Sequence, residues 1–449
     1  MATKEGVRPN VIWVFGDQHR GQALSSMGDP NVNTPHIDCL AGQGVQFTGA
    51  VAGFPLCCPF RGSLVTSRYP HQCVPGHEYR MPPEQPTIAH AFKEAGYHTA
   101  YVGKWHLDGW KEREGRAAMH IVPPERRGGF DEWTGYDNNN AQWDSWVHGG
   151  EGKEAFHTRL PGYETDCLTD LVIDYLKRRA AARTAGDEQP FFAVLSVQPP
   201  HDPYLAPAEF MARHNAGRIQ LRPNVPPVEW IREQARRELA GYYAQIENLD
   251  WNLGRLRAAL AELGLADDTY LVFFSDHGDQ HGSHGFFRKM TPYEEAIRVP
   301  LVIGGGRSPY DCRRGRLGSP VNHVDLAPTT LGLCGIDAPE WMQGTDYSGC
   351  FRRDREVRNA PDSAYLQVVV PTMHNPSLDR AWRGVVTKDG WKYVCTEREP
   401  MMLFNLNEDP YELHNMALVC RYRAERKRLH ERLAQWVSDT EDAFRLPAL

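Results

Sequence analysis

Residues 11–18 read VIWVFGDQ, a short apolar run, rich in β-branched and aromatic residues, that stops abruptly at a Gly, an Asp and a Gln. Such a run predicts a buried strand, and Asp17 then lies just past its carboxyl end. Residues 34–38, TPHID, add a capping Thr and a Pro for the first turn of a helix that Gly42 or Gly44 can end. A strand followed by a helix is therefore the first predicted unit.

Three further apolar runs, at residues 99–102, 191–197 and 270–274, also stop at polar residues. The residues that follow are Lys104 and His106 after the first run, His201 after the second, and Asp276 and His277 after the third. Helical stretches at residues 88–94, 163–181 and 229–265 separate the runs. This alternation predicts an α/β fold with a large, mostly parallel central sheet sandwiched between helices. Because ligands bind at the carboxyl ends of such strands, these polar residues should converge on one rim.

The pattern changes in the last quarter of the chain. Short strand-like pieces at residues 365–370, 383–387 and 391–396 precede a charged helix near residues 424–440. We therefore predict a main domain at residues 1–355 and a smaller C-terminal α+β subdomain at residues 356–449, with short antiparallel strands and a terminal helix. The two parts are expected to share an interface.

Composition argues against several classes of partner. The formal net charge is −7 over 449 residues and no dense block of Lys and Arg occurs, so we expect neither nucleic acid nor an anionic membrane as a partner. No apolar run reaches the roughly 18 residues of a membrane span. We predict a cytoplasmic protein, with an exported form whose signal has been removed as the alternative. Ten cysteines without regular spacing predict mainly buried thiols.

Residues 57–68, CCPFRGSLVTSR, hold the most informative pattern. Pro59 suits the first turn of a helix, which places Cys57 at a helix N-terminus, where free N–H groups and the helix dipole favour an anion. Arg61 follows four residues later and can lie on the same face. The alternative interpretation is a capped helix whose cysteines pack in the core.

The same segment resembles the C-x-P-x-R core and the following L-x-T-x-R of formylglycine-dependent sulfatases, a family of the alkaline-phosphatase-like superfamily. Phe60 and Ser67 depart from the usual residues, but neither belongs to the core triplet. Further matched strings follow the family order at residues 9–11, 34–38, 103–106, 275–278, Lys289 ahead of 293–295, 403–406 and 409–410. The resemblance covers most of the chain and implies an alkaline-phosphatase-like fold.

The candidate ligands of a divalent cation are Asp17, Asp276 and His277, because a hard cation needs carboxylate oxygens from separate loops. Many sulfatases carry two consecutive acids at the first position, whereas here Gly16 replaces the first acid and Gln18 follows the second. Either one ligand is missing or Gln18 supplies an oxygen. The resemblance adds the modified Cys57 as a ligand and implies Ca²⁺, with Mn²⁺ and Mg²⁺ as alternatives.

The resemblance also implies the chemistry. A formylglycine-generating enzyme would convert Cys57 to formylglycine; one hydroxyl of its hydrate attacks sulfur, forms a covalent sulfoenzyme and releases the alcohol. Lys104 and Lys289, together with the metal, hold the sulfate oxygens. His201 protonates the leaving oxygen, the role of a general acid. His106 helps to deprotonate the second hydroxyl, so that sulfate leaves and the aldehyde is restored.

Arg61 is implied to orient residue 57, and Lys104, His201 and Lys289 are implied to bind the substrate. Together these residues predict a sulfuric ester hydrolase that cleaves the sulfate monoester of a carbohydrate or an aryl alcohol. The expected partner is a sulfated small molecule or oligosaccharide, and a homo-oligomer is left open. The alternatives are a phosphonate monoester or phosphodiester hydrolase with the same nucleophile, and a non-catalytic sulfated-glycan binding protein in which Cys57 stays a thiol.

Overall fold

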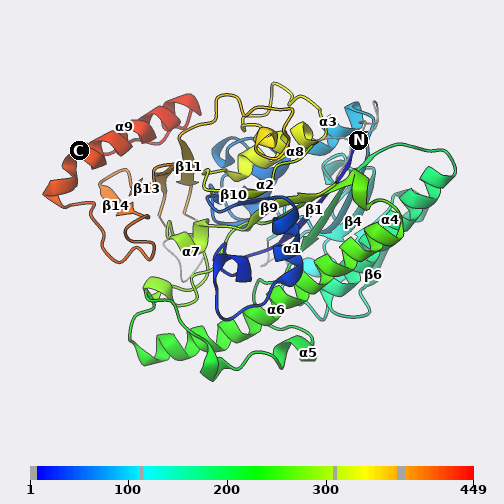
Figure 1. Ribbon diagram of the computed structural model, residues 1–449, viewed down its shortest axis with the longest axis horizontal. Coiled ribbons are helices and arrows are strands. Elements are labelled where there is room, and N and C mark those ends of the chain that lie inside the picture. The colour runs from blue at the N-terminus through cyan, green and yellow to red at the C-terminus, as the bar shows by residue number, and fades with distance from the viewer. Residues whose placement is uncertain (1–7, 112–114, 307–310, 372–379) are drawn as a thin grey trace.

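The computed structural model describes residues 8–111, 115–306, 311–371 and 380–449. Within these ranges the largest element is a ten-stranded sheet with the order β10-β2-β9-β8-β1-β7-β3-β4-β5-β6 (Figure 1). Its strands are β1 (Asn10–Gly16), β2 (Val45–Phe47), β3 (His98–Lys104), β4 (Glu132–Tyr136), β5 (Trp146–Gly149), β6 (Phe156–Arg159), β7 (Phe191–Val197), β8 (Thr269–Ser275), β9 (Leu301–Gly305) and β10 (Gly315–Leu317).

The middle of this sheet is parallel. Strand β1 pairs in parallel with β7 and β8, so that Trp13 lies opposite Val194 on one side and Val272 on the other. Strand β3 continues the parallel set by pairing with β7 and β4. Antiparallel pairs flank it, β8 with β9 and β4 with β5. The predicted α/β fold with a mostly parallel sheet is confirmed, and the carboxyl ends of β1, β3, β7 and β8 share one rim.

The helices are α1 (Pro35–Gln43), α2 (Cys57–Thr66), α3 (Ile88–Glu94), α4 (Glu164–Thr184), α5 (Ala208–Met211), α6 (Glu229–Glu262), α7 (Glu294–Ile297), α8 (Leu326–Leu333) and α9 (Arg423–Asp439). They cover both faces of the sheet. Successive side chains of a strand point to opposite faces, so a strand of apolar residues needs helices on both sides. Trp13 and Phe15 pack with α2, α3 and α8, whereas Ile12 and Val14 pack with α1, α4 and α6. Among the described residues, no helix combines the length and apolar character needed to span a bilayer.

Helix α6 runs the length of one face of the molecule (Figure 1) and passes through Gly254 without a break. A Cβ atom added at Gly254 would lie 2.6 Å from the ring of His36 in α1. The missing side chain therefore lets α1 pack closely against α6.

A second, antiparallel sheet lies at the C-terminal side of the molecule (Figure 1). It has the order β11 (Ser363–Val368), β12 (Trp382–Thr387), β13 (Trp391–Cys395) and β14 (Pro400–Asn405), and α9 packs on β12 and β13. Leu366 and Trp382 of this sheet share an apolar cluster with Phe54 and Leu56, which directly precede α2. The smaller sheet therefore supports the start of α2. The division at residue 355 stays a prediction.

Candidate functional site

Polar side chains from four strand ends, helix α2 and the loop before α7 meet at the carboxyl rim of the parallel strands. Asp17 and Gln18 follow β1, Lys104 ends β3 with His106 just beyond, His201 follows β7, Asp276 and His277 follow β8, Cys57 and Arg61 lie in α2, and Lys289 precedes α7. Each of these residues is 8% exposed or less. The structure thus places every predicted site residue on one buried rim.

The Cys57 thiol lies at the centre of this group. Its Sγ atom lies 3.2 Å from Lys289 Nζ, 3.2 Å from His277 Nε2 and 3.4 Å from Asp17 Oδ1. Leu56, the residue that caps α2, has no side-chain oxygen for the first N–H groups of the helix, so these groups favour an anion.

Asp17, Cys57, Asp276 and His277 form a group that suits a metal ion. Each offers one ligand atom, and these atoms lie within 4.8 Å of one another. His277 Nδ1 donates to the carbonyl oxygen of Gly278 at 3.0 Å, which turns the lone pair of Nε2 toward the other members of the group. Two carboxylates and an imidazole are donors that a divalent cation accepts. The residues present therefore fit the metal that the resemblance implies.

Gln18 turns its oxygen toward this group. Its Oε1 accepts a hydrogen bond from Lys289 Nζ at 2.9 Å, while its Nε2 donates to Asp279 Oδ2 at 2.6 Å. Position 16 has no room for the acid that many sulfatases carry, because a Cβ atom on Gly16 would lie 2.6 Å from the carbonyl oxygen of Pro199. The chain therefore offers the oxygen of Gln18 beside Lys289, whereas the backbone leaves no room for a carboxylate at position 16.

Three buried cations balance the two carboxylates. Lys104 Nζ donates to Asp17 Oδ2 at 2.7 Å. Arg61 Nη2 donates to Asp17 Oδ2 at 3.2 Å and to Asp276 Oδ2 at 3.3 Å. Burial raises the pKa of Asp17, but Lys104 and Lys289 outweigh burial and hold this pKa well below its usual value. A surplus of fixed positive charge in a buried site suits an anionic ester.

His106 and His201 lie at the edge of the group and are neutral at pH 7. Burial, and then Lys104, lowers the pKa of His106 well below its usual value. Burial, and then Lys289, lowers the pKa of His201 to about 4. His201 Nδ1 donates to the backbone carbonyl of Asp202 at 2.7 Å, which leaves the lone pair on Nε2. A bound anion would raise the pKa of His201 toward neutrality.

Cation binding at this group should weaken as the pH falls below about 6. Burial, followed by the charge of Asp17, raises the pKa of Asp276 to about 6, and a cation binds the ionised carboxylate. Below that pH a proton must be displaced for each ion bound, so the affinity for Ca²⁺ or Mn²⁺ should fall by about tenfold per pH unit. Calorimetric titration over this pH range measures the effect. Asp276→Asn should bind more weakly and lose this pH dependence, and an affinity of the unchanged protein that does not vary with pH would contradict the assignment.

The sequence did not identify the residues that hold the site in place. Asp279 accepts hydrogen bonds from Gln18 Nε2 and from the Tyr204 hydroxyl, both at 2.6 Å. The Ser196 hydroxyl accepts a hydrogen bond from Arg61 Nη1 at 2.8 Å. Asp279 carried a usable signal, since it directly follows the matched string SDHG. Tyr204 and Ser196 reach the site only through the tertiary fold.

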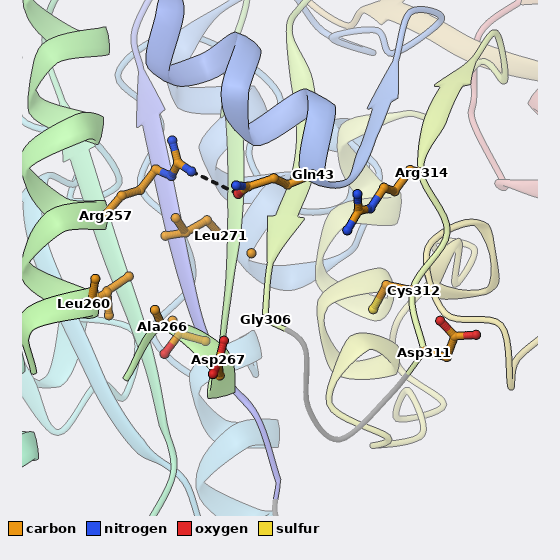
Figure 2. Close-up of a pocket in the computed structure, with 13 residues that line it drawn as sticks. Gln43, Arg257, Leu260, Ala266, Asp267, Leu271, Gly306, Asp311, Cys312 and Arg314 are labelled. Carbon is orange, nitrogen blue, oxygen red and sulfur yellow. Dashed lines mark hydrogen bonds between the residues drawn. The ribbon is translucent and has the colours of Figure 1, made fainter. Parts of the chain in front are cut away.

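A cavity of about 340 Å³ lies at the other end of β8 (Figure 2). Its lining includes Thr269 at the start of β8, Gly305 at the end of β9 and Arg257 of α6. Strand β8 is seven residues long, so Thr269 and Asp276 lie roughly 20 Å apart along it. Because ligands of parallel sheets bind at the carboxyl ends of strands, the rim around Cys57 is the candidate active site.

Comparison with known proteins agrees with this fold and this set of residues. Residues 9–336 match the sulfatase family model, and residues 282–439 match a model described as N-sulphoglucosamine sulphohydrolase, C-terminal. Fold and site therefore define a hydrolase of the sulfatase class. The chain belongs to the sulfatase family.

Individual relatives show the same likeness. An ulvan-active sulfatase from Formosa agariphila is 34% identical over 463 residues, which cover 98% of this chain and 83% of the relative. The crystal structure of yidJ from Bacteroides fragilis, described as a sulfatase, has a TM-score of 0.85 at 26% identity and covers 99% of this chain and 98% of its own. The phosphonate monoester hydrolase of Agrobacterium radiobacter shares the fold, with a TM-score of 0.75 at 21% identity over 96% of each chain.

Proposed function

We propose that this sulfatase hydrolyses the sulfate monoester of a carbohydrate or an aryl alcohol, using a formylglycine made from Cys57 and one divalent cation. The observation that carries the proposal is the placement of Cys57 Sγ within 3.4 Å of Lys289 Nζ, His277 Nε2 and Asp17 Oδ1. A nucleophile between fixed cations and metal-type donors suits attack on an anionic ester. The C-terminal family model, named for a sulphoglucosamine hydrolase, favours a sugar sulfate.

Lys104 and Lys289 would bind the sulfate oxygens. Each is 1% exposed, so its charge acts in a medium of low effective dielectric constant, where it attracts an anion more strongly than in water. Arg61, fixed on Asp17 and Asp276, would hold the carboxylates in place and orient residue 57. When bound, the cation, Ca²⁺ by resemblance with Mn²⁺ or Mg²⁺ as alternatives, would add positive charge and lower the pKa of the oxygen nucleophile.

His201 and His106 would move the protons. His201 Nε2 carries its lone pair in the free enzyme, and the charge of a bound sulfate ester would raise its pKa, so that it could protonate the leaving alkoxide. His106 is neutral at pH 7 and would accept a proton from residue 57 in the step that releases sulfate. Both roles need the imidazole to change protonation state only while substrate is bound.

Hydrolysis of a phosphonate monoester or a phosphodiester is the second candidate. The Agrobacterium radiobacter hydrolase shares the fold, and a phosphoryl group has the same tetrahedral shape as a sulfate. The cations at Lys104 and Lys289 would bind either group. Relative rates on matched substrates with one aryl leaving group therefore decide between the two candidates.

Mass spectrometry of the peptide that contains Cys57, combined with a substrate panel, tests the proposal. In protein from the native host we expect residue 57 as the aldehyde or its hydrate, because residues 57–61 match the C-x-P-x-R core of the family and an aldehyde hydrate supplies the oxygen nucleophile. The panel should contain an aryl sulfate, the matched aryl phosphonate and sulfated glucosamines, each with and without added Ca²⁺ or Mn²⁺. We expect sulfate release that depends on the cation and exceeds phosphonate hydrolysis.

Two results would overturn parts of this proposal. Faster cleavage of the phosphonate would favour the phosphonate monoester hydrolase. An unmodified thiol at residue 57 in protein from the native host, with no ester cleaved, would favour a non-catalytic protein that binds sulfated glycans.

A further inference from the structure

A second group of metal-ligating side chains lies beside the active site. Its members are Cys58 in the first turn of α2, His77 in the segment before α3, and His106 just beyond β3. Their ligand atoms lie within 4.8 Å of one another, and Cys58 Sγ lies 3.9 Å from His77 Nδ1. The rings of His77 and His106 are nearly perpendicular, with centroids 5.8 Å apart. This group shares no residue with the group formed by Asp17, Cys57, Asp276 and His277.

One ligand atom of this group, on His106, is available to an ion. His106 is 3% exposed, and its Nδ1 atom is buried without a hydrogen-bond partner among the described residues. A buried polar atom without a partner costs free energy, and a metal ion would relieve that cost through the lone pair. Burial lowers the pKa of His77 to about 4 and that of His106 well below its usual value. Both imidazoles are therefore neutral at pH 7, which is the form that binds metals.

We propose that Cys58, His77 and His106 form a binding site for a transition-metal ion of the Zn²⁺ type. One sulfur and two imidazole nitrogens suit Zn²⁺, whereas Ca²⁺ and Mg²⁺ require oxygen ligands. Three protein ligands leave the fourth position of a tetrahedral ion to water. On binding, the S–H bond of Cys58 breaks, a Zn–S bond forms and the proton passes to the buffer. The side chain of His77 is 22% exposed and gives the ion a route from solvent.

The consequence for activity follows from His106 and rests on the proposed function. An imidazole whose lone pair binds Zn²⁺ cannot accept a proton from residue 57, so the step that releases sulfate would stop. Zn²⁺ would thus be a reversible inhibitor that acts beside the catalytic cation rather than in its place. Excess Ca²⁺ should not relieve this inhibition, because Ca²⁺ does not compete for a thiolate and two imidazoles.

Binding of Co²⁺ by the Cys57→Ala variant tests the site itself. This variant removes the other thiol of the region, so a thiolate-to-cobalt charge-transfer absorption in the near ultraviolet would come from Cys58. We expect that band, its loss on addition of Zn²⁺ in competition, and its absence when Cys58→Ala is added. Loss of an outer-shell partner already weakens metal binding about 10- to 100-fold, so His77→Ala, which removes a ligand, should weaken it at least about tenfold. Cys73→Ala, which removes a buried thiol outside the group, is the matched control and should keep the band.

Inhibition of the matured enzyme tests the consequence. Zn²⁺ should slow sulfate release by the unchanged protein, and His77→Ala should raise the inhibitory Zn²⁺ concentration at least about tenfold. Absence of the charge-transfer band in Cys57→Ala, or its persistence after Cys58→Ala, would overturn the site. Equal inhibition of the unchanged and His77→Ala proteins would overturn the inhibitory role. The cobalt measurement needs no turnover, so it distinguishes a failure of this inference from a failure of the proposed function.

Discussion

Cys57→Ala should abolish sulfate release, with a loss in kcat of roughly 10³-fold or more, because loss of a covalent nucleophile removes most of the catalysis. Cys57 Sγ contacts Lys289 Nζ, His277 Nε2 and Asp17 Oδ1, so its removal empties the centre of the site. The variant should remain folded, because Ala keeps the small volume at the start of α2. Initial rates on an aryl sulfate measure the loss.

The neighbouring thiol provides a matched control. Cys58 is buried in the same helix turn but lies outside the group formed by Asp17, Cys57, Asp276 and His277. In buffer free of Zn²⁺, Cys58→Ala should keep kcat within about threefold, since no proposed catalytic contact is lost. Comparable losses in both variants would contradict the assignment of Cys57 as the nucleophile. Mass spectrometry of Cys58→Ala would show whether residue 57 is modified in that variant.

The fold was predictable from sequence where buried strands are long and parallel. The run at residues 191–197 has the same bounds as β7, because a strand buried on both faces is a continuous apolar run with sharp ends. The short strands β10, at one edge of the sheet, and β2, next to it, were not predicted. Each has three residues, too few to show a period, and they pair with each other from opposite halves of the sequence.

From the sequence, the site could be predicted only for residues that lie in matched motifs or at the ends of predicted strands. Residues at strand ends, such as Asp17 and His201, could be placed together because parallel strands share one rim. The orientation of Gln18 depends on Asp279, and the proximity of His77 to His106 depends on two loops that meet in space. No periodicity in the sequence encodes such contacts. The exclusion of an acid at Gly16 likewise depends on the approach of Pro199, which only the structure gives.

Arg61→Met should destabilise the metal-free protein by about 3–5 kcal/mol, because it removes the guanidinium that bridges two buried carboxylates and leaves Asp17 with Lys104 and Lys289 alone. Arg61 is 1% exposed and donates to both Asp17 and Asp276. The linear chain of Met keeps much of the volume, so the effect reports charge rather than a cavity. Urea titration with a chelator present measures the loss in the free energy of unfolding. A saturating divalent cation should recover part of that loss, since it supplies positive charge between the same two carboxylates.

Arg383→Met separates stability from catalysis. Arg383 is also buried, and it pairs with Asp442 through Nε at 2.7 Å and Nη2 at 3.0 Å, but it lies in β12 of the second sheet. Arg383→Met should lose comparable stability while the folded protein keeps its kcat. Added cation should stabilise this variant and the unchanged protein by equal amounts, so the difference between them should not change. Arg61→Met should in addition lose at least about 100-fold in kcat, since the fixed charges around residue 57 are disturbed. If Arg61→Met lost less than about 1 kcal/mol, the carboxylates would be protonated or hydrated in the metal-free protein, and Arg61 would not be the group that holds them ionised.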